Sequence, residues 1–238
     1  AKQLRIDENH IENISMYRRS IDARRKNDVH FIATFDVDTS LSEKTVISKA
    51  KNKNAVICEK YKYIPPYTKD LGSRPVVVGF GPAGMFCALV LAQCGQRPIV
   101  IERGDMVENR VKKVTALWND GVIDTESNVQ FGEGGAGTFS DGKLNTGVNN
   151  PRIQWILEQF VAAGAGEDIL FDAKPHVGTD VLLTVVQNIR QRIISLGGEV
   201  RFQSKVTNIQ SKNGIVTGLE LENGGQIPCT HVIFAIGH

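Results

Sequence analysis

The sequence lacks the features that would point to a membrane, secreted or metal-binding protein. No apolar run among its 238 residues approaches the roughly 18 residues of a membrane span. The chain opens at Ala1 with charged and polar residues rather than with a hydrophobic secretion signal. Its 4 cysteines include no C-x-x-C pair, so no redox disulfide of that form is expected. We therefore expect a cytoplasmic protein with reduced thiols, no membrane partner and no metal.

A strong charge of one sign is also missing. The net charge is +2, with 41% hydrophobic and 23% charged residues, which is ordinary for a globular protein. One basic cluster needs to be weighed, because a basic, aromatic-edged hairpin can contact RNA. It consists of Arg18, Arg19, Arg24, Arg25 and Lys26, with Tyr17 and Phe31 nearby. Acidic residues dilute the cluster, so we do not expect a nucleic-acid partner, and RNA binding is kept only as an alternative.

The first part of the chain reads as a small α+β module over residues 1–68. Strands are expected at 11–23 and 29–38, with a turn at 25–28, and a short helix at 42–50. A further strand is expected at 55–64, before Pro65-Pro66 interrupts regular structure. One strand alternates as a half-buried strand would, through Phe31, Ala33, Phe35 and Val37.

The most informative segment lies at 76–84, where three valines precede Gly79-Phe80-Gly81-Pro82-Ala83-Gly84. A helix-like run follows, then an apolar strand at 98–101 that ends at Glu102. This order of strand, glycine turn, helix, strand and acid is typical of a dinucleotide-binding unit. We expect Gly79 to make the tight turn, Gly81 to let the backbone approach a pyrophosphate, and Gly84 to allow close helix packing.

The same segment leaves the ligand open between NAD, NADP and FAD. Glu102 lies 18 residues beyond Gly84, where an acid can bind the adenosine ribose. That carboxylate disfavours the 2′-phosphate of NADP. The sequence around Pro82-Ala83 and Glu102-Arg103-Gly104 favours a flavoprotein.

The rest of the chain predicts an α/β domain with a Rossmann-like parallel sheet and a β-meander over residues 69–238. Helices are expected at 105–120 and 151–163, and a long amphipathic helix capped by Thr179 or Asp180. A strand is expected at 199–202, a meander over 206–229 and a buried parallel strand at 231–237. A substrate-domain insertion is expected to begin around 105–180.

A second glycine-rich run extends from Phe131 to Asn145, with five glycines between positions 132 and 142. Ordering glycine costs extra backbone entropy, so such a run is hard to explain by packing alone. Successive bare N–H groups can instead form an anion-binding nest. Thr138, Ser140 and Lys143 add hydroxyls and a cation. We expect this loop to contact the cofactor.

Both glycine runs, the run 174–180 and the closing 235–238 together resemble the bacterial family of uncharacterised FAD-dependent dehydrogenases, whose cofactor domain is similar to that of glutathione-reductase-like flavoproteins. The resemblance implies FAD as cofactor, with NAD(P)H a possible electron donor. It also implies a set of cofactor-binding residues: Gly79, Gly81, Pro82, Ala83, Gly84, Glu102, Arg103, Arg110, Gly135, Gly137, Thr138, Ser140, Asp141, Gly142, Lys143, Leu144, Val206, Ala235 and Gly237.

The function expected from these residues is that of an FAD-dependent oxidoreductase of unknown small-molecule substrate. An NAD-binding enzyme without flavin is the alternative. The sequence assigns no catalytic residue, and His176 is more typical of a structural residue than of a substrate contact. Since members of the family extend further, we expect this chain to be a fragment that binds FAD weakly or is isolated without it, and that shows no specific turnover.

Overall fold

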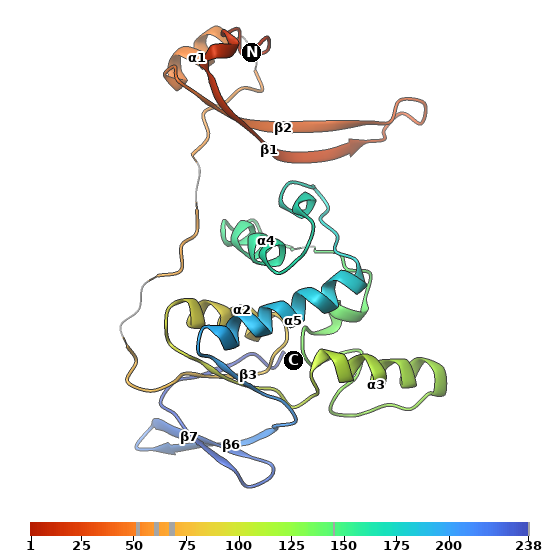
Figure 1. The fold of residues 1–238 in the computed structure, drawn as a ribbon, viewed down its shortest axis with the longest axis vertical. Helices are drawn as coiled ribbons and strands as arrows, with labels where there is room; N and C mark the ends of the chain where they lie inside the picture. The colour runs from red at the N-terminus through yellow and green to blue at the C-terminus, as the bar shows by residue number, and fades with distance from the viewer. Residues whose placement is uncertain (51–52, 60–61, 67–69, 145, 238) are drawn as a thin grey trace. The chain divides into compact units, whose positions relative to one another are not determined.

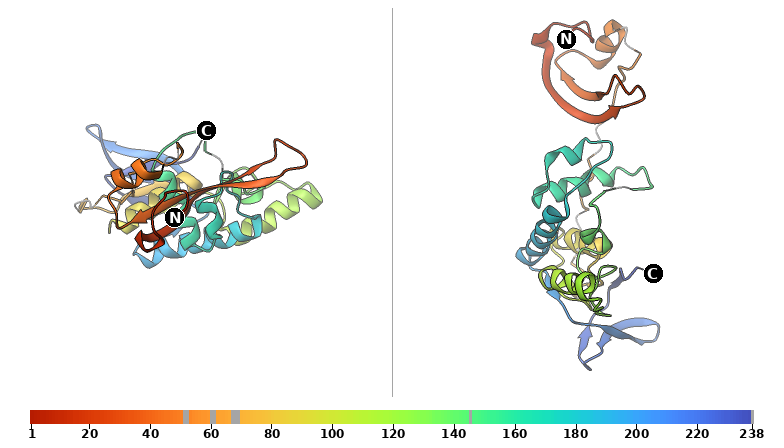
Figure 2. Two further views of the ribbon diagram at one scale, coloured as in Figure 1. Left: turned by 90° about the horizontal axis from the view of Figure 1, so that it is seen from above. Right: turned by 90° about the vertical axis from the view of Figure 1, so that its right-hand side faces the viewer.

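The computed structural model describes all residues except 51–52, 60–61, 67–69, 145 and 238. The chain forms two compact units (Figures 1 and 2). The first unit consists of residues 1–63, 145–157 and 167–175, and the second of residues 64–144, 158–166 and 176–238. The predicted boundary at residue 68 stays a prediction. Within the described residues, no helix has the length and apolar character that a bilayer crossing requires.

The first unit is built on an antiparallel hairpin of β1 (Ile11–Asp22) and β2 (His30–Thr39), preceded by the short η1 (Glu8–His10). The helix α1 (Glu43–Ala50) follows, and the Ser42 hydroxyl accepts from Thr45 N at its start. The short η3 (Glu167–Leu170) belongs to this unit too. After it, Asp172 forms a parallel bridge with Arg19, and their side chains form an ion pair with Nε–Oδ1 at 2.7 Å.

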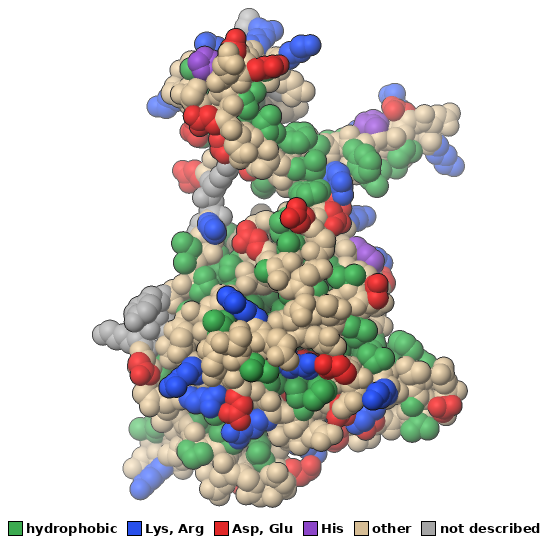
Figure 3. All heavy atoms as spheres, in the orientation of Figure 1, with side chains coloured by type: hydrophobic (Ala, Val, Ile, Leu, Met, Phe, Trp, Pro, Cys, Tyr) green, Lys and Arg blue, Asp and Glu red, His purple; other side chains and the backbone are tan. Residues whose placement is uncertain are grey.

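Two expectations for this unit are wrong. Alternation predicts a half-buried face on β2, but Phe31 is 66% exposed and Phe35 is 50% exposed. Apolar side chains gather along the hairpin in Figure 3. A two-stranded ribbon has no second layer of its own, so a pattern that indicates one buried face does not supply its cover. The strand expected at 55–64 is also absent from the described residues, which form no regular structure there.

The second unit contains a four-stranded parallel sheet in the order β5-β4-β3-β9. Its strands are short: β3 (Val76–Val78), β4 (Ile99–Ile101), β5 (Glu199–Arg201) and β9 (Val232–Phe234). β3 and β4 are buried on both faces, which explains their continuous valine and isoleucine sequences. The chain leaves β3 toward β4 and returns to its other side as β9, so the strand order reverses beside β3.

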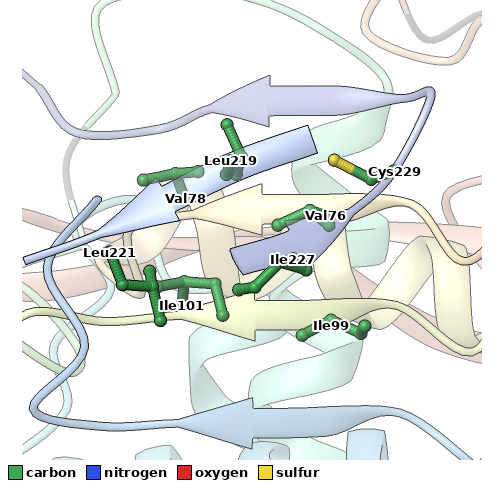
Figure 4. Packing of buried hydrophobic residues seen from close by; sticks show 8 residues of the cluster. All are labelled: Val76, Val78, Ile99, Ile101, Leu219, Leu221, Ile227 and Cys229. Carbon is green, nitrogen blue, oxygen red and sulfur yellow. The ribbon is translucent and has the colours of Figure 1, made fainter. Parts of the chain in front are cut away.

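One face of this sheet is covered by the antiparallel meander of β6 (Val206–Lys212), β7 (Ile215–Leu221) and β8 (Gln226–Pro228). Figure 4 shows the core between the two layers, and its side chains come from both sheets. Its members are Val76, Val78, Ile99, Ile101, Leu219, Leu221, Ile227 and Cys229. The predicted α/β class, with a parallel sheet and a meander, is confirmed at this level.

Helices cover the other face. α2 (Pro82–Gln93) and α5 (Thr179–Ser195) lie side by side above the sheet in Figure 1. α3 (Val107–Asp120) packs against α5, and so does the short η2 (Ala136–Phe139). α4 (Arg152–Ala162) begins in the first unit and ends in the second. The expected cap of α5 is wrong, because Gly178 is the N-cap and Thr179 is already helical.

Candidate functional site

The candidate site lies where β3, β4 and β9 end. Gly79 follows β3, Glu102 follows β4 and Ala235 follows β9, so the three parallel strands bring these residues to one edge. This edge includes the place beside β3 where the strand order reverses. Open α/β sheets bind ligands at such a switch point, outside the carboxyl ends of their strands.

The first glycine loop, residues 79–84, has the geometry that its sequence predicts. Gly79 has φ +98°, and a Cβ there would lie 2.6 Å from the Ala235 carbonyl oxygen. A Cβ on Gly84 would lie 1.9 Å from the Gly79 oxygen, so only glycine lets α2 pack this close to the turn. Gly81 differs from both, because a Cβ there would meet no atom within 4 Å. The backbone at Gly81 therefore faces open space.

α2 begins at this open side. Gly81 is its N-cap, Pro82 occupies the first turn, and no side chain caps the helix among the described residues. The first N–H groups of a helix have no partners within the helix, and they carry the positive end of its dipole. An N-terminus of this kind can hold a phosphate group, and a proline here removes only an N–H that the helix does not use.

Glu102 is buried, with 4% of its surface exposed. Its Oε2 accepts from Phe80 N at 2.7 Å and its Oε1 accepts from Gly104 N at 2.8 Å. The carboxylate thus ties the first glycine loop to the end of β4. An ionised carboxylate has about four acceptor positions, so these two bonds leave capacity for ligand hydroxyls.

The second glycine loop, residues 131–144, lies directly on the first. Gly134 N donates to the Phe80 oxygen at 2.9 Å. Gly135 has φ +71°, and a Cβ there would lie 2.6 Å from Pro82 Cδ. Two glycine-rich segments far apart in sequence therefore meet at the N-terminus of α2. The sequence predicts both loops at the cofactor but does not predict this direct contact.

Arg110 of α3 binds the backbone of the second loop and of the residues just before it. Its side chain is fully buried and donates to the backbone oxygens of Asn128, Val129, Glu133 and Gly135, at 2.7–3.3 Å. Four of its five N–H donors are used in this way. Burial lowers the pKa of Arg110 to about 10, so it keeps its charge at neutral pH. The structure thus gives Arg110 a role in shaping the loop, and its predicted contact with a phosphate stays a prediction.

Glu133 and Arg190 form a buried ion pair that sequence reasoning missed. Arg190 of α5 donates from Nη1 to Glu133 Oε2 at 2.7 Å, and it also pairs with Glu108 of α3. Glu133 Oε2 accepts from Val107 N at 2.5 Å as well. Burial raises the pKa of the Glu133 carboxyl to about 7. Two features of the sequence could have indicated this pair: Glu133 is an acid within a glycine-rich run, and Arg190 is a charged residue on the apolar stripe of a helix.

The far end of the second loop pairs with the run 174–180. Val177 N donates to the Gly142 oxygen at 2.9 Å, and Lys143 forms an antiparallel bridge with His176. Gly142 has φ +70°, and a Cβ there would lie 1.7 Å from the Val177 oxygen. Asp141 and Lys143 form an exposed ion pair at 2.5 Å, which lowers the pKa of Asp141. The structure thus places His176 beside the loop.

The remaining predicted residues lie at several places. Thr138 is buried, and its Oγ1 has no hydrogen-bond partner among the described residues. Ser140 Oγ donates to the Gly137 oxygen at 3.2 Å, and Arg103 pairs with Glu126 at 2.6 Å. Ala83 is exposed on the first turn of α2, Leu144 is half-buried, Val206 begins β6 and Gly237 has φ +74°.

Comparison with known proteins gives two sequence matches. The model of a domain of unknown function, DUF8436, matches residues 1–38. An uncharacterized protein of Clostridium beijerinckii is 45% identical over 241 residues, covering 100% of this chain and 45% of that protein. The chain thus spans less than half the length of this relative, and neither match names an activity.

Solved structures give weaker likenesses. A THI4 from Thermovibrio ammonificans is 18% identical with a TM-score of 0.43, over 70% of this chain and 58% of that one. A 3-ketosteroid-delta4-(5alpha)-dehydrogenase from Rhodococcus jostii is 15% identical with a TM-score of 0.40, over 69% and 46%. A ferredoxin reductase from Rhodopseudomonas palustris is 17% identical with a TM-score of 0.34, over 69% and 24%. At these TM-scores, the likenesses assign no activity to this chain.

Proposed function

We propose that this protein is an FAD-dependent oxidoreductase acting on a small-molecule substrate that is still to be identified. The observation that carries the proposal is the contrast between the glycines of the first loop. At Gly79 and Gly84 a Cβ would clash with neighbouring backbone atoms, so packing requires glycine there. At Gly81 a Cβ would clash with nothing, so packing does not require glycine. A glycine facing open space at a helix N-terminus is what close approach of a pyrophosphate requires.

The residues around Gly81 fit a dinucleotide. The N-terminus of α2 would receive the pyrophosphate, and the Glu102 carboxylate would accept from the ribose hydroxyls. The second glycine loop would add its backbone N–H groups and the hydroxyl of Thr138, whose Oγ1 has no partner among the described residues. The exposed Asp141 and Lys143 would face polar groups of the cofactor or substrate.

A flavin would supply hydride chemistry at its own ring, and the protein would bind it, orient it and exclude water. We also propose that the protein is a member of the uncharacterised FAD-dependent dehydrogenase family. NAD(P)H is the proposed electron donor, and the cytoplasm is the proposed location. The alternative of an NAD-binding enzyme without flavin uses the same first loop. That alternative gives the second glycine loop no role. Since FAD binding does give this loop a role, we favour FAD.

The proposal is tested by Gly81→Ala, with Gly147→Ala as the matched control. A Cβ at either position meets no atom within 4 Å and neither glycine has a positive φ, so both variants should fold like the wild type. Only Gly81→Ala should weaken FAD binding, because its methyl would project toward the pyrophosphate. We expect at least about a tenfold loss of affinity, or about 1.4 kcal/mol, by flavin fluorescence titration.

Identification of the bound nucleotide separates the alternatives. Titrating the protein with FAD and with NAD should give saturable binding of FAD. Binding of NAD alone would contradict the flavin assignment. Equal FAD affinity in the wild type and Gly81→Ala would contradict the placement of the pyrophosphate. Failure of both this chain and its longer Clostridium beijerinckii relative to bind either nucleotide would contradict the proposed function.

A further inference from the structure

The carboxyl of Glu133 is the most unusual buried group outside the first glycine loop. The residue has no exposed surface. Its Oε2 accepts from Val107 N and from Arg190 Nη1, at 2.5 and 2.7 Å. Its Oε1 is also buried but has no hydrogen-bond partner in the described part of the chain. One oxygen of this carboxyl is therefore buried without a donor from the described residues, which is costly for an ionised group.

The charges around Glu133 are not balanced. Two guanidinium groups face it, Arg190 from α5 and Arg110 from α3. Two further carboxylates act on it, Glu108 of α3 and Glu102 at the end of β4. When all are ionised, three negative charges stand against two positive ones. A proton on Glu133 makes the cluster neutral, and Oε1 is the free oxygen that can carry it.

Glu133 also lies at the connection between the second glycine loop and the helices. Its neighbour Gly134 donates to the Phe80 oxygen, and the Glu133 oxygen accepts from Arg110. A change at this carboxyl thus acts on the segment that rests against the first glycine loop.

We propose that Glu133 is a positioning residue whose protonated carboxyl seats the second glycine loop on α3 and α5, and whose ionisation favours release of the loop. When the loop leaves, water reaches the carboxyl and its cost of ionisation disappears. The desolvation of Glu133 in the seated state outweighs the attraction of Arg190, because Arg190 is shared with Glu108.

The sign of the pH effect follows from the two states of the loop. Burial raises the pKa of Glu133 from 4.5 to about 7 in the seated state. A group with a raised pKa stabilises the seated state fully below the lower value, and this contribution is lost as pH rises toward the upper one. The ratio of seated to released loop should therefore fall between about pH 4.5 and pH 7 and then level off.

Amide hydrogen exchange followed by NMR measures this ratio without any cofactor. The Gly134 N–H, bonded to the Phe80 oxygen, reports on the seated loop. After correction for intrinsic exchange, its protection in the wild type should fall about 10- to 30-fold between pH 5.5 and pH 8. In Glu133→Gln, which keeps the shape but does not ionise, the protection should stay within about twofold over the same range.

Glu108→Gln tests whether the sharing of Arg190 with Glu108 keeps the Glu133 carboxyl protonated. Glu108 bonds to the same Arg190, but it is 40% exposed and that bond lowers its pKa, so it does not titrate in this window. This variant removes one negative charge and leaves Arg190 to Glu133 alone, so its protection should fall less between pH 5.5 and pH 8 than that of the wild type. A flat wild-type profile would overturn the proposal, and so would a Glu133→Gln profile that still falls like the wild type.

A second measurement keeps the proposal testable if Glu133→Gln does not fold. The carbon-13 resonance of the Glu133 side-chain carboxyl in the wild type should titrate with a midpoint near 7. A midpoint near 4.5 would overturn the proposal. FAD affinity adds an arm that rests on the proposed function, since a seated loop should bind FAD more tightly at pH 5.5 than at pH 8. Absence of FAD binding would count against the proposed function alone.

Discussion

At the scale of single residues, the glycines of the first loop have different physical roles. Gly84 has no room for a side chain, since its Cβ would lie 1.9 Å from a backbone oxygen of the turn. A Cβ on Gly81 would meet no atom within 4 Å. Within one sequence motif, packing thus requires the glycine at Gly84 but does not explain the glycine at Gly81.

This difference predicts that Gly84→Ala destabilises the fold, whereas Gly81→Ala does not. Relief of the clash must move α2 or the turn, which should cost about 3 kcal/mol or more. Urea denaturation monitored by circular dichroism measures the change in the free energy of unfolding. If Gly84→Ala unfolds at the same urea concentration as Gly81→Ala, the close packing of α2 on the turn is wrong.

Arg110 is the residue whose loss should be most severe. Arg110→Met fills a similar volume but leaves four carbonyl oxygens without their donor, three of them in buried hydrogen bonds and one in a part-buried bond. We expect a loss of about 3–5 kcal/mol in the free energy of unfolding. Arg103→Met is the control, because Arg103 is 45% exposed and pairs at the surface with Glu126, so it should cost about 1 kcal/mol or less. Similar losses in both variants would contradict the buried role of Arg110.

At the scale of elements, the second glycine loop is held at both ends. Gly134 and Gly135 fix one end against Phe80 and Pro82, and Gly142 fixes the other against Val177. Its positive φ values explain why glycine recurs, since other residues adopt this conformation only with strain. The loop therefore has a defined conformation that contacts at both ends maintain.

Gly142→Ala should release the far end of this loop. Its Cβ would lie 1.7 Å from the Val177 oxygen, so Lys143 and His176 could no longer pair as they do. We expect faster proteolytic cleavage between residues 140 and 150 under native conditions. Gly137→Ala, where a Cβ meets no atom within 4 Å, should be cleaved at the wild-type rate. Equal cleavage of both variants would show that the pairing does not hold the loop.

At the scale of the whole molecule, the cysteines lie in separate environments. Cys87 belongs to α2, Cys94 donates from Sγ to the Pro66 oxygen, and Cys229 is buried in the core below the sheet. Burial raises the pKa of the Cys87 and Cys229 thiols, which disfavours the reactive thiolate. Thiol chemistry is therefore not expected to take part in the proposed reaction.

Under the proposed function, replacing all four cysteines by alanine should not change the rate at which a given electron donor reduces the bound flavin. Stability should fall by about 1–2 kcal/mol, mostly from the buried Cys229. Stopped-flow absorbance of the flavin bands measures the reduction, and a thermal melt measures the stability. A variant that folds and binds FAD but is no longer reduced would contradict this expectation.

The sequence alone determined the order of elements in the second unit and the first glycine loop. Valine and isoleucine runs, glycine turns and amphipathic spacing are local signals, and they predicted β3, α2, β4, α5 and the meander. They also predicted the roles of Gly79 and Gly84, because the turn and the helix that follow are neighbours in the chain.

Only the tertiary structure decided how distant segments meet. The seating of the second loop on the first, the burial of Arg110 beneath it and the ion pair of Glu133 with Arg190 join residues up to 57 positions apart. Likewise, the alternation in β2 indicated one apolar face but did not determine whether anything covers it. Burial and charge pairing depend on which surfaces come together in space, and a local pattern in the sequence does not specify this.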